Sequence, residues 1–299
     1  MLGPHVVGHR VVVRRVVRGE IGPSGGPALT DVLGICTAWG DSVCVVAPDG
    51  EGARDPVTIA IADIVSGKPV PPRASTRHRV TPQEAQRRAL ALWADLETAA
   101  LGDWLLRRSP SATARRANSV LAMTPSGVAD AHDGVVAFYE SHGQRPIAAV
   151  LPDSAEDALF RSHGWVLESP DDDTVFELAG VAAARRTLQG VALPDVDVVV
   201  AGDDHRVTAS VTLDGRVLAN GIAACADDWV GFRAIEVDRA ARGRHLGLAV
   251  MEALLEWGAE RGATTAYLQV LGDNTRAFAL YDGLGFTEHH RYRYLAAPL

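Results

Sequence analysis

The sequence is short of lysine, cysteine and long apolar runs, and each shortage excludes a class of protein. Lys68 is its only lysine, so arginine supplies nearly all of the 29 basic residues. The three cysteines, Cys36, Cys44 and Cys225, are isolated, which argues against a disulfide scaffold or a zinc site and favours buried thiols in a reducing cytoplasm. No run of about 18 or more apolar residues occurs, so no membrane-spanning helix is expected. Residues 1–18 lack the continuous apolar core of a signal peptide.

What the chain does contain is typical of a globular protein. Apolar residues make up 47% and charged residues 22% of its 299 residues, which excludes disorder along the whole chain. The formal net charge of −8 argues against a general nucleic-acid binder, because such proteins usually have a basic balance. At roughly 100–200 residues per domain, the length predicts two or three domains.

Residues 1–72 are predicted to form a small N-terminal domain of short strands. Turn signals rich in glycine and proline, at 22–27 and 48–50, separate several of its strand-like runs. The strand-like runs are 6–17, 32–38, 42–47 and 56–64. Strands of this length and spacing predict a small all-β barrel that is SH3-like. The proline-rich segment 67–72 is expected to be a stiff linker to the rest of the chain.

Residues 73–180 begin with signals for a helix. Thr81 is a good N-cap, a proline follows it, and Glu84 completes a capping box. Apolar residues continue at helical spacing, so the helix is predicted to run on to Gly102. Strands and helices then alternate, and the stretch 179–192, rich in alanine and arginine, is expected to be a connector.

A short internal repeat links this region to the end of the chain. Segment 159–165 aligns with segment 280–286, and each reads as a helix end, a glycine and an aromatic residue that starts a strand. Strands precede and follow the helix in both places. We therefore predict two copies of one α+β unit, near 103–180 and 195–299.

The most informative stretch is 237–249, where a strand enters a loop rich in arginine and glycine and an amphipathic helix leaves it. Gly243 and Gly247 remove side chains where a ligand can approach the main chain. The first N–H groups of the helix lack internal partners, and with the helix dipole they favour an anion such as a diphosphate. Arg242 and Arg244 add cations suited to phosphate, although an ordinary surface loop is the alternative for this stretch taken alone.

Over 195–295 the order of these features resembles the general-control-related N-acetyltransferase superfamily, GNAT. In that family a strand leads into an Arg/Gln-x-x-Gly-x-Gly/Ala loop whose amides hold the diphosphate of coenzyme A. This sequence places the pattern on 242–247, with His245 in place of the middle glycine. The resemblance implies an α+β fold with a GNAT-type mixed sheet flanked by helices. In it, 181–299 is the acetyl-CoA-binding domain and 73–180 is a helix with a degenerate GNAT-like half.

The resemblance also implies which residues bind acetyl-CoA and act on it. A main-chain N–H of the strand 235–237 would stabilise the oxyanion, because a preorganised donor is needed there. The Asn274 side chain would bond the pantetheine arm, and the Tyr281 hydroxyl would protonate the leaving thiolate. Taken singly, Asn274 also reads as a plain N-cap and Tyr281 as a core aromatic. The implied cofactor-binding residues are Ile235, Val237, Arg242, Gly243, Arg244, His245, Leu246, Gly247, Leu248, Asn274 and Tyr281.

Direct attack of an amine on the thioester calls for a general base. Glu236 is the nearest carboxylate on the strand and is the predicted base, with a solvent-facing strand residue as the alternative. The other candidates are Asp227, Asp228, Glu288, His289 and His290. In the first copy Phe160 stands at the position of Tyr281, so that copy is predicted to be structural.

The sequence therefore predicts a cytoplasmic N-acetyltransferase that moves an acetyl group from acetyl-CoA to a primary amine of a small molecule or a protein. No metal, membrane or nucleic-acid partner is expected. One alternative is a non-catalytic acyl-CoA-binding sensor, suggested by His245. The other is an interaction module in which the N-terminal domain recruits a partner.

Overall fold

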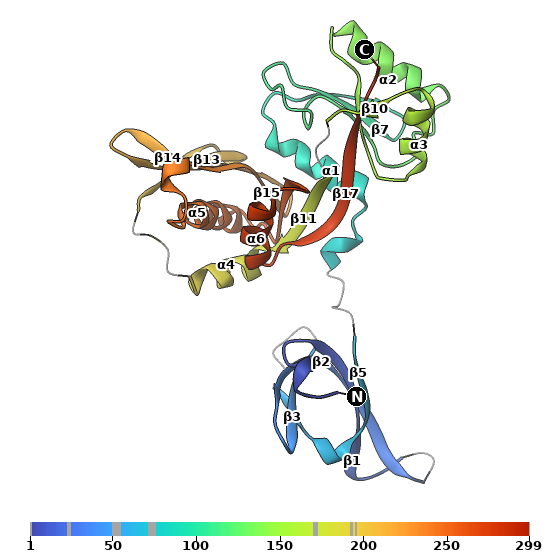
Figure 1. Cartoon of the computed structure of the whole chain (residues 1–299), viewed down its shortest axis with the longest axis vertical. Helices are drawn as coiled ribbons and strands as arrows, with labels where there is room; N and C mark the ends of the chain where they lie inside the picture. The colour runs from blue at the N-terminus through green and yellow to red at the C-terminus, as the bar shows by residue number, and fades with distance from the viewer. Residues whose placement is uncertain are drawn as a thin grey trace. The chain divides into compact units, whose positions relative to one another are not determined.

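Figure 1 shows a computed structural model of the chain, coloured from the N-terminus to the C-terminus. It describes residues 2–22, 25–49, 55–70, 76–169, 173–191, 194 and 196–298. Parts of the predicted turns at 22–27 and 48–50, and the end of the predicted linker at 71–72, lie outside the described residues. The chain divides into two compact units, Met1–Ser75 and Thr76–Leu299, and each is described by itself.

The first unit contains a five-stranded antiparallel sheet. Its strands are β1 Arg10–Ile21, β2 Pro27–Trp39, β3 Val43–Pro48, β4 Val57–Ala60 and β5 Ile64–Pro69, with the 3-10 helices η1 Pro4–Val6 and η2 Ile61–Asp63. The strand order is β4-β3-β2-β1-β5. The prediction of a closed SH3-like barrel is therefore wrong. Among the described residues β4 pairs with β3 and β5 pairs with β1, so the sheet keeps two unpaired edges.

The core of this unit is formed by the side chains that point to one face of the sheet, because side chains alternate between the two faces along each strand. Val11 and Val13 of β1 are buried, and they pack with the buried thiols of Cys36 and Cys44 from β2 and β3. These cysteines are free, as predicted. The predicted linker begins late, because residues 67–69 belong to β5 and pair with β1.

The second unit is built around one long mixed sheet. Its strand order is β12-β13-β14-β15-β16-β11-β17-β9-β8-β7-β6, and β10 pairs with β17 beside this path. The pairs β8–β9 and β15–β16 are parallel. The strands are β6 Glu97–Leu101, β7 Trp104–Arg108, β8 Val120–Ala122, β9 Ile147–Val150, β10 Val166–Leu167, β11 Thr174–Gly180, β12 Val198–Gly202, β13 Arg206–Leu213, β14 Arg216–Ala226, β15 Trp229–Val237, β16 Thr265–Leu271 and β17 Thr287–Ala296.

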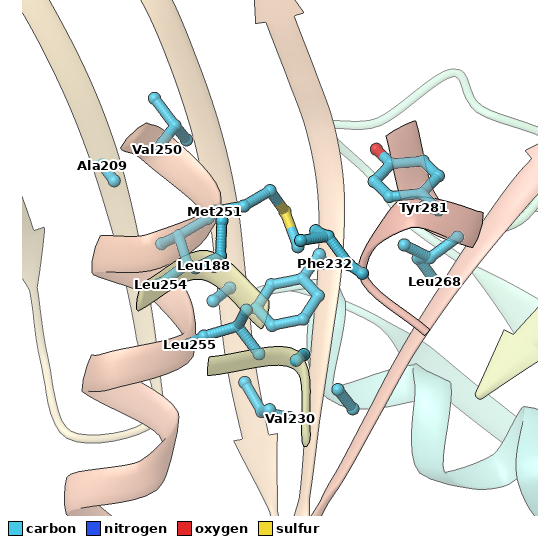
Figure 2. Packing of buried hydrophobic residues seen from close by; sticks show 14 of the residues in the cluster. Leu188, Ala209, Val230, Phe232, Val250, Met251, Leu254, Leu255, Leu268 and Tyr281 are labelled. Atoms are coloured by element: carbon cyan, nitrogen blue, oxygen red, sulfur yellow. The ribbon is translucent and has the colours of Figure 1, made fainter. Parts of the chain in front are cut away.

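Helices cover both faces of this sheet. They are η3 Thr76–Arg79, α1 Pro82–Arg88, η4 Ala89–Leu92, α2 Ala131–Ser141, α3 Ala155–Ser162, α4 Val181–Gln189, η5 Arg239–Ala241, α5 Leu246–Glu260 and α6 Thr275–Gly283. In the part of the sheet with the order β13-β14-β15-β16-β11-β17, we call one face the α5 face. Phe232 packs there with Leu254 of α5 (Figures 1 and 2). The opposite face is the α1 face, where Phe176 packs with Ala85 of α1. None of the described helices has the length and apolar character that a membrane crossing requires.

The helix predicted from Thr81 to Gly102 is shorter than expected. The Thr81 hydroxyl accepts the Glu84 N–H at 3.3 Å, so the predicted N-cap is confirmed, but α1 gives way to η4 and then to β6. Gly102 instead forms the turn between β6 and β7, with φ +61°, and a Cβ there would lie 1.9 Å from the Ser126 carbonyl oxygen. Pairing of β6 with β7 therefore overrides the helical spacing. The expected connector 179–192 contains helix α4.

The two halves of the second unit share one sheet. β11 lies between β16 and β17 and pairs antiparallel with both. The strand that precedes the predicted domain boundary at 180 therefore belongs to the same sheet as the strands of the last hundred residues. The sequence predicts domain boundaries at residues 72 and 180, and it stays a prediction that the segments on either side of them fold independently.

The two segments that repeat in the sequence end their helices in the same way. The Trp165 N–H donates to the Phe160 carbonyl at 3.1 Å, and the Phe286 N–H donates to the Tyr281 carbonyl at 3.0 Å. The glycine before each aromatic residue has φ +81°. In local structure, the two repeated segments therefore share one feature: a helix that ends at a glycine.

Candidate active site

Strands β15 and β16 pair for only part of their length. Their parallel register ends at Phe232 with Leu268, although both strands continue beyond this pair. We call the unpaired ends, residues 233–237 and 269–271, the fork. Residues 233–237 do not pair with β16, so their main-chain N–H and C=O groups on that side can bind a ligand as they would bind another strand.

A β-bulge shapes β15 within the fork. Ala234 and Ile235 together oppose Gly221 of β14, and Ala234 has a left-handed φ of +51°. The Ile235 side chain occupies the space above Gly221, where a Cβ would lie 2.4 Å from the Ile235 Cδ1. Ile235 and Val237 pack on the α5 face. Because side chains alternate along a strand, Glu236 lies on the α1 face, where it is exposed.

The loop after β15 carries six consecutive main-chain N–H groups without a protein acceptor in the described part of the chain. They belong to residues 242–247. Gly243 and His245 have left-handed φ values of +79° and +57°, so His245 adopts the conformation that glycine favours. His245 is also the N-cap of the 15-residue helix α5. Unsatisfied donors at the positive end of a helix dipole form a site for an anion.

Charges around this loop favour the same ligand. Arg242 and Arg244 are exposed on it. The carboxylate of Asp238 accepts the Ala240 N–H at 2.9 Å and pairs with Arg216 at 2.5 Å. These two contacts hold the pKa of Asp238 below its usual range, and the Arg216 guanidinium offsets the negative charge of the carboxylate. A diphosphate therefore meets cations and N–H donors at this loop with little repulsion.

Asn274 and Tyr281 lie at opposite ends of α6. The Asn274 side-chain oxygen accepts the Ala277 N–H at 3.1 Å, so this residue is the N-cap of α6. Capping uses the oxygen and leaves the amide N–H groups of the same side chain to bind a ligand. The two readings that the sequence left open for Asn274 are therefore compatible.

Tyr281 is a largely buried phenol. It is 8% exposed, and its ring packs against Phe286 with 5.8 Å between the ring centroids. Figure 2 shows it beside Leu268, the last residue of β16 that pairs with β15. Burial, and then the negative charge of Glu177, raise the pKa of Tyr281 to about 12. The hydroxyl therefore keeps its proton at neutral pH and can donate it.

The comparison with known proteins identifies the family of this chain. The family model described as "Probable histone acetyltransferase Rv0428c C-terminal" matches residues 84–295. The chain belongs to this family. Over 300 residues it is 29% identical to Probable histone acetyltransferase Rv0428c of Mycobacterium tuberculosis, with 92% of each chain covered. This family member is therefore a GNAT-type acetyltransferase.

One further relative and one solved structure match parts of the chain. The ribosomal protein bS18-alanine N-acetyltransferase of Escherichia coli is 35% identical over 78 residues, which are 26% of this chain and 53% of the relative. A GCN5-related N-acetyltransferase from Kribbella flavida shares the fold with a TM-score of 0.56 at 15% identity. That match covers 76% of this chain and 97% of the other.

Two of the candidate bases of this GNAT protein are held in packing contacts. His290 is buried, lies 3.1 Å from the Gln86 side-chain nitrogen through Nε2, and stacks on Phe176. Burial, with His289 beside it, lowers the pKa of His290 to about 3. The Nε2 of His289 lies 2.8 Å from the Val80 carbonyl oxygen. These contacts leave neither imidazole well placed to accept a substrate proton.

The acidic candidates differ in where they lie. Asp227 and Asp228 precede β15 at the end away from the fork. Glu288 pairs with Arg291 at 2.9 Å on the surface. Glu236 is the candidate that lies within the fork itself.

A carboxylate that the sequence pattern does not reveal lies near Tyr281. Glu177 pairs with Leu268 across β11 and β16, is 3% exposed, and has a buried Oε2 without a partner in the described part of the chain. Burial, followed by the charges of Asp282 and Glu288, raises its pKa to about 7. The one hint in the sequence is a single glutamate inside the apolar strand β11.

Proposed function

We propose that this chain moves the acetyl group of acetyl-CoA to a primary amine by direct attack, without a covalent enzyme intermediate. The observation that carries the proposal is the run of unpartnered N–H groups at 242–247, placed directly after the unpaired end of β15. The loop suits a diphosphate, and the fork suits the amide-containing pantetheine arm. Acetyl-CoA supplies the activated thioester when it is bound.

The residues of the fork then take separate roles. The main chain of Ile235 and Val237 binds the arm and donates an N–H to the developing oxyanion. The amide of Asn274 binds the same arm. Glu236, on the α1 face, accepts the proton that the ammonium group must lose. As the new C–N bond forms and the C–S bond breaks, Tyr281 gives its proton to the sulfur. The attacking nitrogen then loses its second proton, which restores the Tyr281 phenol and leaves a neutral amide and a free thiol.

The acceptor in this proposal is a primary amine of a protein or of a small molecule. One relative is named as a probable histone acetyltransferase, and another as an alanine N-acetyltransferase of a ribosomal protein. Both names describe acetyl transfer to protein amines, which supports including such amines among the proposed acceptors.

We also propose that 103–180 is a second, inactive copy of the GNAT unit. Support comes from the parallel pair β8–β9, with α2 between the strands, which corresponds to β15–β16 with α5 between them. The shared helix ends at Trp165 and Phe286 support it further. Phe160 has no hydroxyl, so this copy lacks the proton donor that Tyr281 provides.

Reversing charge at the loop tests the proposed function. The double substitution Arg242→Glu and Arg244→Glu should weaken acetyl-CoA binding about tenfold or more in calorimetry, because two anions would then face the diphosphate. Acetyl-pantetheine, which has no diphosphate, should bind both proteins alike. Arg186→Glu, exposed on α4, is the matched control. Equal losses for both thioesters would place the diphosphate elsewhere.

A further inference from the structure

Arginines stand on both sides of the fork on its α1 face. Arg233 is the first residue of β15 beyond the paired segment. Across the fork, Arg116, from the segment between β7 and β8, donates from Nη2 to the main-chain oxygen of Gln269 at 3.5 Å. Gln269 is the first residue of β16 beyond the paired segment. Both guanidinium groups therefore lie near the route by which an acceptor on the α1 face reaches the thioester.

Arg116 has no carboxylate partner in the described part of the chain. Its Nε donates to the Tyr292 hydroxyl in a long contact of 3.4 Å. Nearby, Arg107 is 3% exposed and donates to the main-chain oxygen and hydroxyl of Ser119 at 3.0 and 2.7 Å. Burial lowers the pKa of Arg107, and the like charge of Arg116 adds to this effect. Two interacting cations are therefore held here by neutral groups.

The arginines on the other side of the fork also form no ion pair in the part of the chain that the structure describes, although the charge of Arg206 interacts with Asp203. The guanidinium group of Arg233 lies over the Trp93 ring, with 4.6 Å between its Cζ and the ring centroid. Its Nε donates to the Leu92 carbonyl at 3.0 Å. Arg206 of β13 donates to the Ala91 carbonyl at 2.5 Å, and its Nε is buried without a partner. Burial, together with Arg206, lowers the pKa of Arg233.

Several other arginines of this unit form ion pairs with carboxylates, whereas the arginines at the fork contact neutral groups. Arg88 of α1 forms an ion pair with Asp228, and Arg108 of β7 forms one with Glu97 at 2.5 Å. Removing a guanidinium group from water is costly unless an anion compensates for it. The arrangement at the fork therefore calls for an anion that the acceptor can bring.

We propose that the acceptor is a primary amine that also carries a carboxylate or a phosphate, bound by Arg116 and faced across the fork by Arg233. The proposal rests on the proposed acetyl transfer and specifies its substrate class. A guanidinium group can bind either anion through two parallel N–H···O hydrogen bonds. The amine of such a molecule lies toward Glu236, the carboxylate of the fork. A lysine-rich peptide without acidic groups meets like charges here and is expected to be a poor acceptor.

Matched pairs of acceptors test this proposal. Thiol release from acetyl-CoA is measured with β-alanine against β-alaninamide, and with O-phosphoethanolamine against ethanolamine. We expect the anionic member of at least one pair to have the higher kcat/KM by about tenfold or more. Arg116→Gln should bring that ratio to about one, and Arg116→Lys should leave an intermediate ratio. Arg185→Gln, from a surface ion pair on α4, should leave it unchanged.

A binding measurement separates this proposal from the proposed function. Calorimetry with inorganic phosphate is carried out on the loop variant Arg242→Glu, Arg244→Glu, in which the diphosphate loop is disabled, with and without Arg116→Gln. Phosphate binding that Arg116→Gln abolishes, in a protein whose melting curve is unchanged, supports the anion site even if no amine is acetylated. Acetylation without preference for anionic amines, or phosphate binding that Arg116→Gln leaves intact, overturns the inference.

Discussion

At the scale of single residues, two buried acidic groups near the proposed reaction site have raised pKa values. Tyr281 is a phenol with its pKa raised to about 12, and Glu177 is a carboxyl group with its pKa raised to about 7. Burial is the main cause in both cases, and the negative charge of Glu177 further disfavours the Tyr281 phenolate. The phenol is thereby kept protonated over the whole range in which an amine acceptor can lose its proton.

Tyr281→Phe removes the proposed proton donor while keeping the ring. We expect kcat for an identified acceptor to fall by roughly 10²-fold or more, which is the usual contribution of a positioned acid. The dissociation constant of acetyl-CoA, measured by calorimetry, should change by less than about twofold, because the ring contact with Phe286 is retained. A variant with full kcat across the pH range would exclude Tyr281 as the acid.

Glu177→Gln removes a charge that disfavours the Tyr281 phenolate. The pKa of Tyr281 should fall, and ultraviolet titration of the phenol should show this as an earlier rise in absorbance at alkaline pH. Other titratable groups around Glu177 are Asp282 on α6 and Glu288 and Arg291 on β17. Glu256→Gln, which removes a surface carboxylate of α5, is the control. An unchanged titration would show that Glu177 does not act on the phenol.

The same substitution has a signed effect on stability. Because the folded-state pKa of Glu177 is raised, its stabilising contribution is present below about pH 4.5 and is lost as pH rises through about 7. Glu177→Gln should therefore gain Tm relative to the unaltered protein as pH increases from 5 to 8. A difference in Tm that stays constant over this interval would contradict the raised pKa.

At the scale of elements, the fork arises where β15 bulges and β16 stops pairing with it. The bulge needs Gly221 on the neighbouring strand, since the Ile235 side chain lies over that position. Helix α5 then starts from a left-handed residue, His245, which directs the open N–H groups of the loop. Three local features of the backbone thus form one binding surface.

Gly221→Ala tests the coupling between the bulge and the site. The added Cβ would lie 2.4 Å from the Ile235 Cδ1 and 2.8 Å from the Val250 Cγ1. Overpacking of this kind usually costs about 1–3 kcal/mol in the free energy of unfolding, and it should weaken acetyl-CoA binding by displacing the bulge. Denaturant unfolding and calorimetry measure the two effects. Gly283→Ala, with open space around it in α6, should be close to neutral in both.

At the scale of the whole molecule, local charge at the fork opposes the overall charge. The chain has a formal net charge of −8, yet four arginines near the fork form no ion pair among the described residues. They are Arg107, Arg116, Arg206 and Arg233. The net charge is a sum over the surface, whereas recognition depends on the groups that face the ligand. The first unit is an open sheet and contributes none of the candidate site residues.

The sequence by itself determined the strand, the Arg/Gly loop at 242–247, the helix that follows and the order of Asn274 and Tyr281. These features depend on backbone conformation and helix ends, which neighbouring residues control. Tertiary structure alone decided that 97–101 forms a strand, that Glu177 is buried, and that Arg116 lies at the fork. Each of these depends on contacts between residues far apart in the chain, and such contacts leave little trace in local periodicity.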